Sequence, residues 1–241
     1  MQNVNAEQCQ QNKNKVLLII PAYNEAENLP GVVEDILSQK QEMDYVIVSD
    51  GSTDGTLELC RKQQYNYIAL PINLGLAGCF QAGMKYAYRA GYTYAVQFDG
   101  DGQHRAEDVA TLRARMDEGN YDIVLGSRFL RQKKGGSMRE IGSRMISAAI
   151  RLTTGKKVTD PTCGLRIYNR RVIASFAYRL NYGPEPDTIS YLIKNGAHIA
   201  EAPVSIHERQ AGESYLRPMN AIRYMLRMLV SILFIQNFRH E

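Results

Sequence analysis

Short apolar runs alternate along this chain with stretches of helical spacing, and that alternation restricts the possible fold more than any other feature. Five runs predict strands, at 16–20, 45–50, 67–70, 94–99 and 121–128. The first run, VLLII, is continuously apolar, which is typical of a strand buried on both faces of a parallel sheet. Helical spacing follows the first four runs, at 25–39, 51–63, 73–91 and 106–118. This order predicts an α/β fold with a mostly parallel central sheet flanked by helices.

The second half of the chain departs from this regular alternation. It predicts a helix at 141–154, strands within 159–170 and at 198–206, and a last helix from about Pro218. Apolar residues make up 44% of the chain and charged residues 22%, a balance that excludes a disordered protein. The length of 241 residues allows one large domain or two small ones, and no linker-like composition divides the chain. We therefore expect a single Rossmann-like domain at 15–218, after a flexible polar tail at 1–14 and before an amphipathic C-terminal helix at 219–241.

Polar or glycine-rich segments follow all five predicted strands. They are PAYNE (21–25), SDGSTDGT (49–56), NLGLAG (73–78), DGDGQ (99–103) and GSR (126–128). In open α/β sheets, ligands bind at the carboxyl ends of the strands, near the point where the strand order reverses. The five segments therefore predict a cleft that could hold a nucleotide.

The segment after the fourth strand has the most specific chemistry. Asp99 and Asp101 lie two residues apart, and two such close carboxylates repel each other unless a cation or a proton neutralises them. Together with Gln103 they form an oxygen-only donor set, which suits Mg²⁺ or Mn²⁺ shared with substrate phosphates. The alternative is a solvated acidic turn. A calcium loop is excluded because no glutamate follows at the spacing of an EF-hand.

Several common nucleotide and hydrolase motifs are absent from the sequence. The chain contains no GxxxxGK[ST] segment, no GxGxxG after its first strand and no GxSxG elbow. These absences argue against a P-loop enzyme, a dinucleotide-binding fold and an α/β-hydrolase. A metal held by carboxylates in an α/β cleft then favours group transfer from a nucleotide diphosphate.

Seven segments together resemble family 2 glycosyltransferases: IIPAYNEAENL, VIVSDGSTDGT, NLGLAGCFQAG, QFDGDGQH, DIVLGSRF, TDPTCGLRIYNR and ERQAGES. The resemblance extends over about 16–216. It is greatest to the branch that contains dolichol-phosphate mannose synthases and bacterial polyprenyl-phosphate or cell-wall polysaccharide glycosyltransferases. It implies a GT-A fold and an inverting, metal-dependent transfer of a sugar from a nucleotide diphosphate sugar to a polyprenyl phosphate.

Three other functions are weighed against this expectation. Within the family, the acceptor could be a lipid-linked saccharide in cell-wall or surface polysaccharide synthesis. A nucleotidyltransferase also uses paired carboxylates and Mg²⁺, but PAYNEAENL is not its glycine-rich basic loop. A non-catalytic scaffold that binds a nucleotide sugar is disfavoured because Asp99, Asp101 and Gln103 are all present.

The resemblance also implies which residues form the site. The nucleotide-sugar set is Pro21, Ala22, Tyr23, Glu25, Asp50, Gly51, Gly75, Asp99, Gly100 and Asp101. Within it Asp50 would bind the base, Gly75 would let the backbone approach the nucleotide, and Asp99 would contact the ribose or support the metal. Many relatives have two acids where this chain has Ser49 and Asp50, so base recognition here differs in detail.

The metal, phosphate and catalytic sets follow in the same way. The resemblance implies Asp101, Gln103 and His207 as metal ligands, and Arg128, Arg139, Arg209 and Ser214 around donor or acceptor phosphates. The catalytic set is Asp101, Arg128, Glu185 and Asp187. A lipid phosphate is already an anion and needs no strong base, whereas a sugar hydroxyl would need a carboxylate base. The alternatives are a helix N-terminal position for Asp187 and a structural role for His207, and we expect His104 to be an ordinary loop residue.

The charge of the chain is unevenly distributed. Residues 127–157 hold nine Lys/Arg and one acid, and 217–241 hold four Arg and one acid, although the net charge of the whole chain is only +4. The stretches 141–152 and 219–238 have amphipathic helical spacing beside these cations, which predicts docking on an anionic membrane surface. Packing on the body or in a homo-oligomer is the alternative. Nucleic acid is excluded as a partner because Phe129 is the lone aromatic residue of the basic segment.

Cellular location is predicted from three further features. The apolar stretch without charge runs only from Met228 to Phe238, which is shorter than the about 20 residues of a spanning helix. Four scattered cysteines without a CxxC pair indicate free thiols in a reducing compartment. The N-terminal residues lack an apolar signal segment. We expect a cytoplasmic protein, peripheral on the inner face of the cell membrane.

Overall fold

The computed structural model describes residues 12, 15–39, 43–100, 102–131, 135–205 and 218–238, with the backbone alone at 139, 218–220 and 237. The strands are β1 (Val16–Ala22), β2 (Met43–Asp50), β3 (Tyr67–Leu70), β4 (Tyr94–Gln97), β5 (Ile123–Ser127), β6 (Arg166–Asn169) and β7 (Ile199–Pro203). The helices are α2 (Leu29–Ser38), α3 (Thr56–Lys62), α4 (Gly75–Arg89), α5 (Ala106–Asp117), α6 (Met138–Thr154), α7 (Arg170–Tyr178), α8 (Pro186–Lys194) and α9 (Pro218–Leu233), followed by the 3₁₀ turn η2 (Ile235–Phe238).

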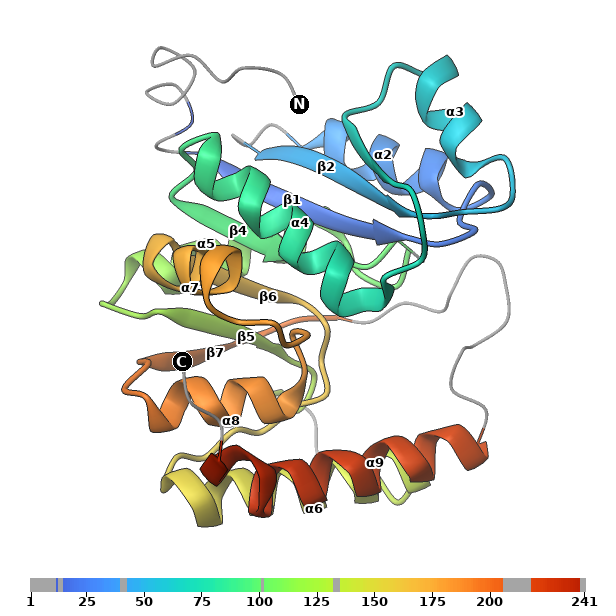
Figure 1. The fold of residues 1–241 in the computed structure, drawn as a ribbon. Helices are drawn as coiled ribbons and strands as arrows, with labels where there is room; N and C mark the ends of the chain where they lie inside the picture. The colour runs from blue at the N-terminus through green and yellow to red at the C-terminus, as the bar shows by residue number, and fades with distance from the viewer. Residues whose placement is uncertain are drawn as a thin grey trace.

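The strands form one sheet in the order β3-β2-β1-β4-β6-β5-β7, with helices on both faces (Figure 1). β6 runs antiparallel to β4 and β5, and the other neighbouring pairs are parallel. The predicted mostly parallel α/β sheet is therefore confirmed. β1 lies between β2 and β4, so the strand order reverses beside β1. Ligand sites are expected at the carboxyl ends of β1 and β4.

The core is divided by the sheet into two layers, and β1 contributes to both. Leu17 and Ile19 lie in one cluster with α4 and α7, whereas Leu18 and Ile20 lie in the other with α2 and α5. All four side chains are fully buried, as the continuous apolar run predicts. Gly83 of α4 makes this packing possible, because an added Cβ would lie 2.3 Å from Ile19 Cγ2.

Helices α6 and α9 lie side by side at the end of the molecule remote from α3 (Figure 1). Their close approach uses Gly142, where an added Cβ would lie 2.8 Å from Met225 Cγ. Met228 and Ile232 of α9 are buried in the same cluster as α6 and α8 residues. The C-terminal helix therefore packs on the body along one face. No helix of the described ranges is long and apolar enough to cross a bilayer.

Asn12, within the predicted tail, and three of the four cysteines are buried. Of the predicted tail at 1–14, the structure describes Asn12, whose buried side-chain amide donates to the Ala90 carbonyl at 2.8 Å. Cys60, Cys79 and Cys163 are buried free thiols. Cys9 lies outside the described residues.

Candidate active site

The predicted nucleotide loops meet at the carboxyl ends of β1 and β4. Phe98 continues from β4 by donating its amide to the Ile19 carbonyl at 3.0 Å, which holds the start of the acidic segment against β1. A Cβ on Gly100 would lie 3.2 Å from the Pro21 carbonyl oxygen, so the turn after Asp99 touches the end of β1. The structure therefore brings the 21–25 and 99–100 segments together, as the strand-end argument predicts.

Asp99 lies in a narrow space between His104 and the backbone at Gly164. Its carboxylate Oδ2 is 3.6 Å from Nε2 of His104, and the Asp99 side chain is 33% exposed. An added Cβ on Gly164 would lie 2.5 Å from the same oxygen, so this approach requires a residue without a side chain. His104 lies in a loop, as expected, but it is 3% exposed, and its Nδ1 has no hydrogen-bond partner among the described residues.

The structure describes some of the predicted metal and phosphate residues and not others. Asp101, His207, Arg209 and Ser214 lie outside the described residues, and the side chain of Arg139 is not described. Gln103 is described and half-buried beside the Asp99 turn. Within the described ranges, no group of three or more His, Cys, Asp or Glu residues could hold a metal. The oxygens of Asp99 and Gln103, on either side of position 101, nevertheless have the chemistry that Mg²⁺ and Mn²⁺ prefer.

Asn24 connects the loop after β1 to the loop after β2. Its φ of 56° is left-handed, and its side-chain oxygen accepts from the amides of Thr53 at 2.9 Å and Asp54 at 3.3 Å. The Glu25 amide donates to Thr56 Oγ1 at 3.0 Å. These bonds fix the backbone that follows Tyr23, a residue that is 48% exposed. Sequence reasoning missed Asn24 as an organiser, although asparagine is one of the few residues that readily adopt this conformation.

Asp50 has a structural partner on each carboxylate oxygen. Oδ1 accepts from the Leu74 amide at 2.7 Å and Oδ2 accepts from the Gly75 amide at 2.8 Å. The residue is 3% exposed. Through these two hydrogen bonds Asp50, at the end of β2, holds the N-terminus of α4. Gly51 allows the β2 loop to touch the 72–73 backbone, because an added Cβ would lie 2.7 Å from the Asn73 nitrogen. Contact between Asp50 and a base stays a prediction.

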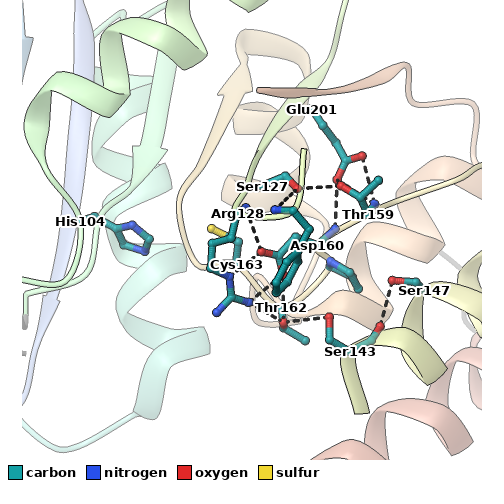
Figure 2. A network of polar contacts seen from close by, with 12 residues as sticks. His104, Ser127, Arg128, Ser143, Ser147, Thr159, Asp160, Thr162, Cys163 and Glu201 are labelled. Atoms are coloured by element: carbon teal, nitrogen blue, oxygen red, sulfur yellow. Dashed lines mark hydrogen bonds and ion pairs between the residues drawn. The ribbon is translucent and has the colours of Figure 1, made fainter. Parts of the chain in front are cut away.

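Arg128, at the end of β5, is held by a bidentate ion pair (Figure 2). Its Nε donates to Asp160 Oδ2 at 2.6 Å and its Nη2 donates to Oδ1 at 2.8 Å and to Thr162 Oγ1 at 3.1 Å. Burial opposes the charge of Arg128, but Asp160 outweighs burial and raises the pKa of the guanidinium above its ordinary value. Its side chain remains 34% exposed, so a charged edge faces solvent at the carboxyl end of β5.

Glu201 of β7 holds the backbone segment that carries Asp160 (Figure 2). Its carboxylate accepts from the amides of Thr159 at 2.8 Å and Asp160 at 3.1 Å, and from Thr159 Oγ1 at 2.8 Å. Burial raises the pKa of Glu201 despite these bonds. Sequence reasoning missed both Asp160 and Glu201. A signal was present, because Glu201 is a lone acid inside the predicted strand HIAEAPVSI.

Arg166 is a buried cation that the sequence analysis also missed. It begins the antiparallel strand β6, opposite Gln97 of β4, so it lies at the same edge as the parallel strand ends. The guanidinium donates to the carbonyls of Cys163 at 3.0 Å and Pro161 at 2.8 Å, and to the Pro184 carbonyl. These bonds join the segment after Asp160 to the segment that contains Glu185.

Glu185 and Asp187 occupy the N-terminus of α8. Glu185 is the N-cap residue and accepts from the Tyr224 hydroxyl. Asp187 is 5% exposed in the first turn, where Oδ1 accepts from the Thr188 amide at 2.8 Å and Oδ2 accepts from Ser231 Oγ at 2.6 Å. Asp187 therefore lies where the helix N-terminal alternative predicts. A catalytic role for either acid stays a prediction.

A cavity of about 310 Å³ lies beside the contact between this acidic segment and α9. Its lining includes Tyr182, Glu185, Asp187, Thr188, Arg227 and Ser231. An added Cβ on Gly183, at one side of the cavity, would lie 3.5 Å from Ala77 Cβ of α4. The acidic segment is thus adjacent to the helix whose N-terminus Asp50 holds. The site is a continuous edge that runs from the β2 loop through α4 to α8.

Comparison with known proteins agrees with this arrangement. The family model described as glycosyl transferase family 2 matches residues 17–176. A polyprenol monophosphomannose synthase of Mycolicibacterium smegmatis is 30% identical over 230 residues, covering 89% of this chain and 85% of that protein. An undecaprenyl-phosphate mannosyltransferase of Micrococcus luteus is 31% identical over 215 residues, covering 83% of this chain and 86% of that protein.

A solved structure extends the likeness of fold. Glucosyl-3-phosphoglycerate synthase from Mycobacterium tuberculosis, in complex with Mn²⁺, uridine diphosphate and glucosyl-3-phosphoglycerate, superposes with a TM-score of 0.67 at 19% identity. The match covers 98% of this chain and 84% of that one, and it shows the same α/β architecture. With the family match over more than half of its length, this chain is an enzyme that belongs to glycosyl transferase family 2.

Proposed function

We propose that this enzyme transfers a sugar from a nucleotide diphosphate sugar to a polyprenyl phosphate with inversion at the anomeric carbon. The observation that carries the proposal is the similarity over most of the chain to two relatives named for polyprenyl-phosphate mannosyl transfer. The arrangement supports it, because the predicted donor loops meet at the strand-order reversal and Arg128 exposes a cationic edge nearby along the sheet.

On the donor side, Pro21, Tyr23 and Glu25 would line the nucleoside pocket. Asp101, Gln103 and His207 would hold Mg²⁺ or Mn²⁺, with Asp99 beside them. When bound, the metal would stabilise the negative charge that develops on the leaving diphosphate. Solved structures of similar fold that hold uridine diphosphate with Mn²⁺ or Mg²⁺ support the use of a divalent metal.

On the acceptor side, Arg128, Arg139, Arg209 and Ser214 would bind phosphate oxygens. The two hydrogen bonds to the Asp160 carboxylate keep the Arg128 guanidinium in one orientation, which suits recognition of a phosphate. A phosphate oxygen is already an anion, so it can attack the anomeric carbon without a strong general base. Glu185 would have to act as a base only if the acceptor were a saccharide hydroxyl.

The surface formed by α6 and α9 would hold the enzyme at the membrane. Its exposed apolar residues are Met138, Ile141, Met145, Leu152, Ile222, Leu226, Val230 and Phe234. Exposed cations accompany them: Arg144, Arg151, Arg223 and Arg227. An apolar surface with basic residues around it fits anionic lipid head groups, such as those of the inner leaflet of a bacterial membrane.

The test is a donor and acceptor screen on the full chain. UDP-, GDP- and dTDP-sugars are each offered with undecaprenyl phosphate, and lipid-bound product is measured with Mg²⁺, with Mn²⁺ and with EDTA. We expect metal-dependent product with one donor class. Asp101→Ala should lower kcat by at least about 100-fold with an unchanged Tm, because the metal stabilises charge in the transition state.

Three outcomes would redirect the proposal. Transfer only to a lipid-linked saccharide would favour the alternative acceptor. Binding of a nucleotide sugar without turnover on any acceptor would favour the scaffold. Full activity in EDTA and in Asp101→Ala would remove the metal assignment, and Asp117→Ala, an exposed acid on α5, is the matched control.

A further inference from the structure

Helix α9 presents different residues to its two sides. Its outer stripe is apolar and exposed: Ile222, Leu226 and Val230, spaced four residues apart and continued by Phe234 just after the helix. Its inner side buries Met228 and Ile232 and also carries two hydroxyl groups, on Tyr224 and Ser231. Hydroxyls on an inner helix face need hydrogen-bond partners, and both groups find them on the same segment of the site.

That segment is the start of α8. The Tyr224 hydroxyl donates to Glu185 Oε2, and Ser231 Oγ donates to Asp187 Oδ2 at 2.6 Å. In η2, the side-chain amide of Gln236 donates to the backbone carbonyl of Asp187. Three side chains from the C-terminal elements thus bind the short acidic segment 185–187.

The electrostatics keep Tyr224 in the form that can donate. Burial and the neighbouring carboxylate of Glu185 raise the pKa of Tyr224 far above its ordinary value, so the phenol stays protonated. On the other side of the segment, the fully buried guanidinium of Arg166 donates to the Pro184 carbonyl. The residues 184–187 are therefore held between β6 and α9.

We propose that Tyr224 and Ser231 are positioning residues, through which α9 fixes Glu185 and Asp187 at the acceptor end of the site. The inference rests on the proposed function for what the acceptor is, and on the contacts alone for what α9 does. Because the same helix carries the outer apolar stripe, the element that would meet the lipid is also the element that holds the acidic segment.

The cavity strengthens this assignment. Glu185, Asp187 and Ser231 line it together with Met228 and with Ile235, an exposed apolar residue of η2. Thr188, 1% exposed, also lines it, and its hydroxyl oxygen has no hydrogen-bond partner among the described residues. The cavity is therefore apolar on one side, near the outer surface, and polar on the other, where α9 holds the acidic segment. An amphipathic acceptor likewise has an apolar part and a polar part.

The test compares Tyr224→Phe and Ser231→Ala with Tyr178→Phe. Tyr178 is an exposed tyrosine of α7, so its variant controls for the loss of a phenol oxygen. Amide hydrogen exchange of the segment 183–190 is measured on each full-length variant, together with Tm and steady-state kinetics. The proposal predicts at least about fivefold faster exchange in this segment for both α9 variants, while exchange in β1 changes little. Because each variant takes a donor from a carboxylate, Tm should fall by no more than about 8 °C.

Kinetics supply the second readout. With a polyprenyl phosphate acceptor, which needs no general base, both α9 variants should raise the acceptor KM by about tenfold or more, with the donor KM within about twofold of wild type. A loss of kcat instead would indicate that Glu185 acts as a base on a saccharide hydroxyl. Unchanged exchange at 183–190 in both variants would overturn the proposal. If exchange rises as expected while no donor and acceptor pair supports turnover, the positioning role stands and the proposed function fails. Tyr178→Phe should match wild type in every measurement.

Discussion

At the scale of single residues, the ion pair between Arg128 and Asp160 is expected to stabilise the fold at the carboxyl end of β5. Asp160 is 1% exposed and receives two guanidinium hydrogen bonds, whereas Arg128 keeps a third of its side chain in solvent. Removing the carboxylate charge leaves the guanidinium partly buried and without a counter-ion. That situation is more costly than the loss of an exposed ion pair.

We therefore predict that Asp160→Asn lowers the free energy of unfolding by about 2 kcal/mol, within the range of charge-assisted hydrogen bonds. For a chain of this size that corresponds to a fall in Tm of roughly 4–8 °C. Thermal unfolding followed by circular dichroism measures it. Asp117→Asn, which weakens an exposed pair with Arg113, should cost less than about 0.5 kcal/mol. Equal losses of unfolding free energy in the two variants would contradict a larger contribution from the buried carboxylate of Asp160.

Gly164 offers a second test at this scale, because its missing side chain leaves room for Asp99. In Gly164→Ala the new Cβ would meet Asp99 Oδ2 at 2.5 Å, and the carboxylate can move away at little cost in stability. We expect Tm within about 3 °C of wild type but at least about tenfold weaker activation by Mg²⁺ or Mn²⁺, because ligand geometry determines metal affinity. A metal titration of activity measures this.

The control for that variant is Gly55→Ala. Gly55 has a φ of −74° and no atom within 4 Å of an added Cβ, so alanine fits there without strain. If Mg²⁺ or Mn²⁺ activates the Gly164→Ala enzyme as it activates wild type, activation by metal does not depend on the position of the Asp99 carboxylate.

Some of these residues could be predicted from the sequence and others could not. The acids after β4 follow from the rule that strand ends carry ligands, and the structure places Asp99 at the predicted edge. Asp160, Arg166 and Glu201 owe their roles to partners that lie 32, 18 and 42 residues away in the chain. Such pairings depend on the register of the sheet, which hydrophobic periodicity alone does not determine.

At the scale of elements, the same limit applies to strand β6. The first five strands follow from apolar runs of ordinary length, and all five are confirmed. β6 was expected within 159–170, but nothing in its four residues indicates that it runs antiparallel between β4 and β5. This reversal is what brings Arg166 to the ligand edge, so a long-range feature of topology determines a residue of the site.

Asp122 shows how one side chain joins several elements. At the start of β5, its carboxylate accepts from Arg171 of α7 at 2.8 and 2.5 Å, from Asn169 Nδ2 at 2.9 Å and from the His198 amide at 2.8 Å. Burial alone would raise the pKa of Asp122, but these bonds outweigh burial and lower it below its ordinary value.

A depressed folded-state pKa stabilises the protein above the unfolded value of about 3.9 and loses that contribution as the pH falls through the folded value. We predict that Asp122→Asn lowers the free energy of unfolding by about 2 kcal/mol at neutral pH. The difference from wild type should shrink progressively below about pH 4. Urea unfolding at several pH values measures it, and a difference that stays constant to pH 3 would contradict the linkage.

At the scale of the whole molecule, the two amphipathic segments form one surface. Sequence periodicity predicts an apolar face on each helix but cannot show that the helices pair. In the structure α9 packs on α6, and their buried sides join the main core through Ile146, Ile150, Met228 and Ile232. Deleting 219–241 would therefore expose core, so substitutions on the outer stripe are the cleaner test of docking.

Charge and apolar area make separable contributions to docking on such a surface. Exposed cations on α6, on α9 and in the turn after α6 are Arg144, Arg151, Lys156, Lys157, Arg223 and Arg227. Each basic residue near an anionic bilayer contributes about 1 kcal/mol, and salt screens that contribution. The outer stripe, by contrast, contributes through burial in the interface, which salt does not screen.

We therefore predict that partition into vesicles of phosphatidylglycerol and phosphatidylcholine falls at least about tenfold between about 0.05 and 0.5 M NaCl. Sedimentation of the protein with vesicles measures the partition. A Leu226→Glu/Val230→Glu variant, altered at two exposed positions, should bind more weakly at both salt concentrations while keeping its Tm. Vesicles of phosphatidylcholine alone should bind the wild type weakly and with little salt dependence. Equal partition into neutral and anionic vesicles at both concentrations would show that the cations of this surface do not contact lipid.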